Sequence, residues 1–132
     1  MTTRAKKRAT SKVQQKQLDR PKVRLPIPDE FLDIMGEPWV VIQNKIPTTL
    51  DLADILMFTV RNASVKTGDD AIRTLDCFQT IKASNGTIEM NRDDWEWMLA
   101  HFKETAHTIW KPPDAAYLVR WLMSNIQSTP TN

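Results

Sequence analysis

The feature that most constrains this chain is a continuous apolar stripe with helical spacing in its second half. Asn91 marks the start, with Asp94 three residues later, as in a capping box. Pro112-Pro113 marks the end, because proline cannot continue a helix. The stripe at i, i+3, i+4, i+7, i+11 and i+14 consists of Trp95, Met98, Leu99, Phe102, Ala106 and Ile109. This pattern predicts a long helix with one buried face.

Three further segments have helical signals. We expect one from a cap at Thr48 or Thr49 to about residue 62, and another from Asp69-Asp70 to just before residue 85. The last begins near Asp114 and runs to about residue 127. In the second, Ile72, Leu75, Phe78 and Ile81 form an apolar side. Four helices with short loops predict an all-α domain over residues 48–127, to which a minor β contact between residues 39–42 and 87–90 could be added.

The N-terminus carries most of the positive charge. Its nine basic residues are Arg4, Lys6, Lys7, Arg8, Lys12, Lys16, Arg20, Lys22 and Arg24. With one acid, residues 1–24 carry a charge of +8, whereas the remaining residues have nine bases and fifteen acids. Residues 1–20 hold only three large apolar side chains, so we expect a disordered basic arm that contacts a nucleic acid or an acidic protein surface.

Residues 21–47 differ from the arm, because five prolines punctuate a segment rich in large apolar side chains. Prolines favour extended backbone, and the apolar side chains need a surface to cover. We expect this segment to wrap along its own domain or to dock on a partner. At the other end, residues 128–132 are polar and are expected to fray.

Four aromatic residues are candidates for protein interfaces, because they lie outside the predicted core faces. They are Phe31, Trp39, Trp97 and Trp110. In the alternative interpretation, Trp39 folds back over the domain and Trp97 packs beneath it.

Catalytic and metal sites are poorly supported. His101 and His107 are six residues apart, which places them about 120° apart around a helix and gives poor convergence on a metal. The acids at 93, 94 and 96 fall in the first turn of a helix, where the positive end of the helix dipole stabilises negative charge. Cys77 has no histidine near it in sequence, and its apolar neighbours favour a buried, inert thiol. We therefore expect no enzyme, no metal and no cofactor.

From about residue 48 to 124 the chain resembles a group of small tailed-bacteriophage proteins of poorly defined role. The resemblance lies in the order of the segments 49–56 (TLDLADIL), 69–75 (DDAIRTL), 88–94 (IEMNRDD) and 113–122 (PDAAYLVRWL). It implies a phage or prophage origin and supplies no functional residue.

These observations favour a non-enzymatic phage accessory protein with a structural or assembly role in the virion, docking on a larger phage or host protein. One alternative is a sequence-independent nucleic-acid-binding or regulatory module that acts through the basic arm. Another is an inhibitor of a host protein. No apolar run approaches the roughly 18–20 residues that cross a bilayer, so no membrane partner is expected. We expect the host cytoplasm or the virion as its location.

Overall fold

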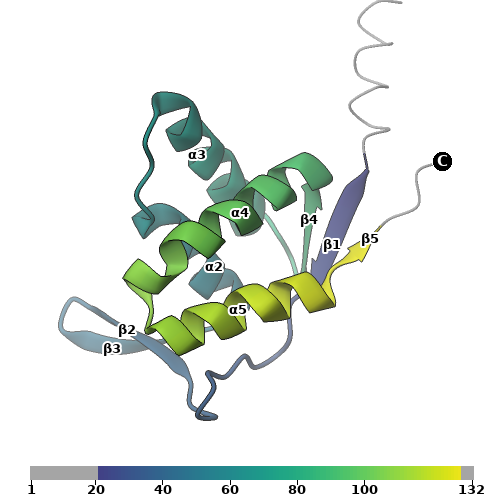
Figure 1. Cartoon of the computed structure of the whole chain (residues 1–132). Helices are drawn as coiled ribbons and strands as arrows, with labels where there is room; N and C mark the ends of the chain where they lie inside the picture. Colours follow the sequence, from purple (N-terminus) through teal and green to yellow (C-terminus); the bar gives the residue numbers. More distant parts are fainter. Residues whose placement is uncertain (1–20, 129–132) are drawn as a thin grey trace, which may run out of the picture.

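The structure is a computed structural model that describes residues 21–128. In chain order its elements are β1 (Lys22–Pro26), β2 (Trp39–Gln43), β3 (Ile46–Leu50), α2 (Leu52–Asn62), α3 (Gly68–Lys82), β4 (Thr87–Asn91), α4 (Arg92–Ile109), α5 (Pro112–Asn125) and β5 (Gln127–Ser128) (Figure 1). The predicted all-α class is wrong. The fold is mixed, with a three-stranded antiparallel sheet in the order β4-β1-β5 and a separate β2-β3 hairpin.

The central strand of the larger sheet, β1, comes from the proline-punctuated segment. Val23 pairs with Met90 and Leu25 with Ile88, and all four side chains are buried. Arg24 between them is exposed, which is the two-residue alternation of a half-buried strand. Residues from the N-terminal segment therefore form part of the core of the folded unit.

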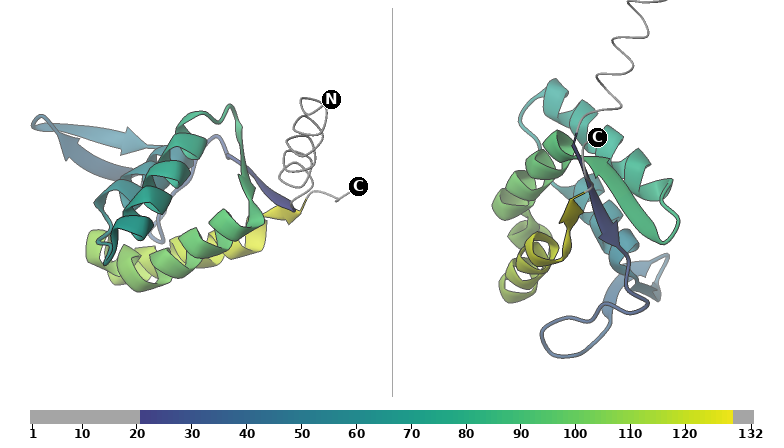
Figure 2. Two further views of the ribbon diagram at one scale, coloured as in Figure 1. Left: turned by 90° about the horizontal axis from the view of Figure 1, so that it is seen from above. Right: turned by 90° about the vertical axis from the view of Figure 1, so that its right-hand side faces the viewer.

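The hairpin corrects the expected β contact, because residues 39–43 pair with residues 46–50 and not with β4. Its base is buried, where Trp39 lies opposite Leu50. Its tip is the two-residue turn Asn44-Lys45, with φ of 51° and 66°. Figure 1 and the left view of Figure 2 show the hairpin extending away from the helices.

The helix starts differ partly from those expected. Asp51 caps α2: its carboxylate accepts from the Asp54 N–H at 2.8 Å, and the Asp54 carboxylate accepts from the Asp51 N–H at 3.4 Å. Thr48 and Thr49, the expected caps, lie in β3. Asn91 precedes α4 without a capping hydrogen bond from its side chain.

The long helix is confirmed as α4, and its stripe packs into the core. Its buried residues are Trp95, Met98, Phe102 and Ala106. α5 lies beside α4 in Figures 1 and 2 and buries Leu118 and Leu122. With α2 and the inward side chains of β1 and β4, these helices form one hydrophobic cluster.

Candidate protein-interaction surface

Three of the four aromatic interface candidates hold the fold together. Phe31 and Trp39 are buried and stack with ring centroids 5.9 Å apart. Trp110 meets Trp39 edge-on at 5.0 Å, and its indole Nε1–H donates to Thr59 Oγ1 at 2.8 Å. These contacts join the hairpin base to α2 and to the end of α4. Folding thus accounts for the apolar character of Phe31 and Trp39 without a partner.

The fourth candidate, Trp97, does not pack beneath Trp39. It is half-buried on α4 and stacks on His101, with ring centroids 4.9 Å apart and an interplanar angle of 16°. The Arg73 guanidinium lies 5.9 Å from its ring centroid and also contacts Asp94 at 3.5 Å. This arrangement ties α3 to α4.

Two of the nine basic candidates, Lys22 and Arg24, lie on β1. Both approach Glu89 on β4, at 3.6 Å and 3.9 Å. The carboxylate of Glu89 therefore compensates part of their positive charge. The other seven, at positions 4–20, lie outside the described residues.

Within residues 21–128 no three His, Cys, Asp or Glu side chains cluster as metal ligands. Burial lowers the pKa of His101, whose Nε2 is enclosed without a hydrogen-bond partner in that part of the chain. Burial likewise raises the pKa of the Cys77 thiol to about 12, so the reactive thiolate is strongly disfavoured. The structure gives these groups packing roles on α3 and α4.

The apolar side of α3 lies partly at the surface. Of the four side chains that form it, only Ile81 is buried, and Cys77 on the same helix is also buried. Ile72 and Leu75 are 59% and 52% exposed, and Phe78 is half-buried. The apolar side of this helix therefore faces the core only in part.

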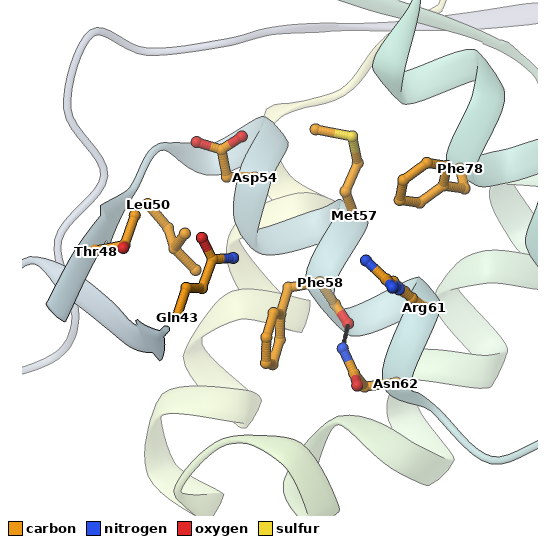
Figure 3. A pocket seen from close by; sticks show the side chains of 9 residues that line it. All are labelled: Gln43, Thr48, Leu50, Asp54, Met57, Phe58, Arg61, Asn62 and Phe78. Carbon is orange, nitrogen blue, oxygen red and sulfur yellow. Dashed lines mark hydrogen bonds between the residues drawn. The ribbon is translucent and has the colours of Figure 1, made fainter. Parts of the chain in front are cut away.

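A hollow of about 410 Å³ lies between the hairpin, α2 and α3 (Figure 3). Its lining comprises Gln43, Thr48, Leu50, Asp54, Met57, Phe58, Arg61, Asn62 and Phe78. Asn62 Nδ2 donates to the Phe58 carbonyl at 2.8 Å, and Asp54 belongs to the α2 capping box. Burial, followed by the neighbouring Asp51 charge, raises the pKa of Asp54. The side chains of Asp54 and Asn62 therefore form hydrogen bonds with backbone groups of α2 or its cap.

A second hollow of about 410 Å³ adjoins the first, because Arg61 and Phe78 line both. It continues over Val60, Thr74 and Leu75. We call this surface the α2–α3 face and define it by Met57, Arg61, Leu75 and Phe78, which line the hollows, and by Ile72, which lies one helical turn before Leu75 on α3. Arg61 is exposed and forms no ion pair within residues 21–128, which leaves one cation beside these apolar side chains.

The sequence of α3 shows which apolar residues share a side of the helix, but it does not show which side of the helix is buried. Cys77 and Ile81, four residues apart, form a narrower stripe that serves as the buried side. Only the position of α2 and α4 selects that stripe over the more apolar one.

Comparisons with protein-family models, with curated proteins and with solved structures give no match to this chain. No helix within residues 21–128 is long and apolar enough to cross a membrane.

Proposed function

We propose that this chain is a non-enzymatic docking protein that binds a larger protein through the α2–α3 face. The observation that carries the proposal is the exposure of Ile72 and Leu75 beside the two joined hollows. Burying an exposed Leu or Ile side chain fully stabilises a complex by about 1.5–3 kcal/mol. Two such side chains around Phe78 have the chemistry of an interface centre, and Arg61 can select the orientation of the partner.

The resemblance to tailed-bacteriophage proteins gives the proposal a setting. There, the docking would serve the virion or its assembly, and the partner would be a larger phage structural protein or a host protein. An inhibitor of a host protein would use the same face, so the identity of the partner decides between these roles.

The test uses the full-length chain as bait in lysate of phage-infected cells, with and without nuclease treatment, followed by affinity measurement with the purified partner. Leu75→Asp replaces an apolar contact of the face by a carboxylate, and we expect it to weaken binding at least about tenfold, because the apolar burial is lost and the carboxylate must leave water. Met35→Asp is the matched control, since Met35 is 79% exposed and lies outside the face.

Binding that is equal for Leu75→Asp and wild type would show that the face does not dock. Recovery that disappears after nuclease treatment would instead favour the nucleic-acid module. Thermal melts of both variants exclude unfolding as the cause of any loss.

A further inference from the structure

A further hollow, separate from the α2–α3 face, lies between α4 and α5. Its volume is about 530 Å³, and it shares no lining residue with the α2–α3 face. Its lining comprises Phe102, Lys103, His107, Pro112, Ala115, Ala116, Val119, Arg120, Met123 and Ser124. We call it the α4–α5 groove.

The floor of the groove is apolar. Phe102, Ala115 and Val119 belong to the core and are at most 9% exposed. Met123 is 50% exposed and therefore supplies most of the accessible surface among the large apolar side chains of the lining. Apolar side chains of a ligand could therefore leave water on entering the groove.

The walls of the groove are basic. Lys103 on α4 and Arg120 on α5 each contribute a cation to the lining, and α4 also contributes the His107 imidazole. Among residues 21–128 no carboxylate lines the groove, although acids outnumber bases fifteen to nine in residues 25–132. Lys103 and Arg120 are exposed and form no ion pair within residues 21–128.

We infer that the α4–α5 groove binds an acidic amphipathic helix of another protein. The apolar stripe of that helix would lie on Val119 and Met123, and its carboxylates would flank the stripe and meet Lys103 and Arg120. Proteins that bind a helix in a groove take the apolar face of an amphipathic helix onto a hydrophobic surface.

Charge and polarity select this occupant over two others. The N-terminal segment of this chain carries a charge of +8, so the basic walls would repel it. A nucleic-acid backbone would satisfy the cations but would leave the apolar floor without a partner. An acidic helix with an apolar stripe matches both features.

The test measures fluorescence anisotropy of a labelled helical peptide with leucines at i, i+3, i+4 and i+7 and flanking glutamates. A scrambled peptide of the same composition serves as the control, because the basic N-terminal residues attract any acidic peptide. We expect the full-length chain to bind the amphipathic peptide at least about fivefold more tightly than the scrambled one, as two exposed charge pairs and an apolar contact allow.

Charge reversal isolates the groove. The double variant Lys103→Glu/Arg120→Glu should lose this preference, and a peptide with lysines in place of glutamates should then bind it better than wild type. Lys66→Glu/Lys82→Glu makes the same change in net charge at exposed sites outside the groove and should keep the preference. Met123→Asp should also reduce binding, and a thermal melt separates this effect from any destabilisation of α5.

Three results would overturn the inference. The first is equal affinity for the amphipathic and scrambled peptides. The second is an unchanged preference in Lys103→Glu/Arg120→Glu. The third is tight binding of labelled duplex DNA or RNA that this double variant abolishes, which would assign the groove to nucleic acid.

Discussion

At the scale of residues, burial makes the thiol of Cys77 harder to ionise and so less reactive. Cys77 is fully covered, and the cost of desolvating a thiolate raises its pKa to about 12. The nearby Asp94 adds to this rise and Arg73 opposes it. The thiol therefore behaves as a small apolar core group, as its apolar sequence neighbours suggested.

Cys77 predicts how stability responds to alkaline pH. In the unfolded chain the thiol ionises near its ordinary pKa of 9.0, whereas in the fold it keeps its proton up to about 12. The folded state thus binds more protons above pH 9, and stability falls as the pH rises. Between pH 8 and 10.5 this thiol should cost about 2 kcal/mol of unfolding free energy.

Urea denaturation of wild type and Cys77→Ala at both pH values measures this effect. We expect Cys77→Ala to lack this part of the pH dependence, although its stability at pH 8 is lower because the substitution leaves a small cavity. An identical fall in both proteins would contradict the assignment.

At the scale of elements, the hairpin is held at its base and extends freely at its tip. Trp39 and Leu50 anchor it, whereas Ile42 and Ile46 near the turn are 75% and 64% exposed. An isolated two-stranded hairpin is marginally stable in water, so the turn has a large influence on its population. Lys45 at φ 66° is unfavourable there, because its Cβ crowds the backbone in the left-handed region.

Lys45→Gly should therefore stabilise the hairpin by about 1 kcal/mol, since Asn-Gly suits a turn with two positive φ angles. Slower amide hydrogen exchange in β2 and β3 would report it. Asn44→Gly is the control and should give a smaller effect, because asparagine already tolerates this conformation. Exchange rates that are unchanged by Lys45→Gly would show that the turn does not limit the hairpin.

At the scale of the whole molecule, residues 21–50 belong to the same folded unit as the helices. β1 is the middle strand of its sheet, and Val23 and Leu25 are almost completely buried. Phe31 and Trp39 then cover the helices through ring contacts: Trp39 meets Trp110 at the end of α4, and Phe31 meets Tyr117 and Trp121 on α5. The helices alone would expose these surfaces to water.

A chain that begins at residue 48 should consequently show no cooperative thermal transition, whereas one that begins at residue 21 should melt cooperatively. The lost burial of Val23 and Leu25 alone is worth about 1.5–3 kcal/mol per side chain, against a typical domain stability of about 5–15 kcal/mol. Circular dichroism melts compare the two. Equal transitions would mean that the helices fold without β1.

The sequence by itself determined the elements whose signal is local. The apolar residues from Trp95 to Ala106 have helical spacing and predict one helix with one buried side, and α4 forms as predicted. The two prolines at 112 and 113, which were expected to separate the last two helices, occupy the first turn of α5.

Only the tertiary structure decided the sheet and the exposed face of α3. β1 is five residues long and lies among prolines, and its pairing with β4 depends on a segment far along the chain, which no local pattern can reveal. On α3, two stripes could have been buried, and packing against the neighbouring helices covered Cys77 and Ile81 while leaving Ile72 and Leu75 in water. Periodicity fixes which residues share a side of a helix, but the elements packed around it determine which side is covered.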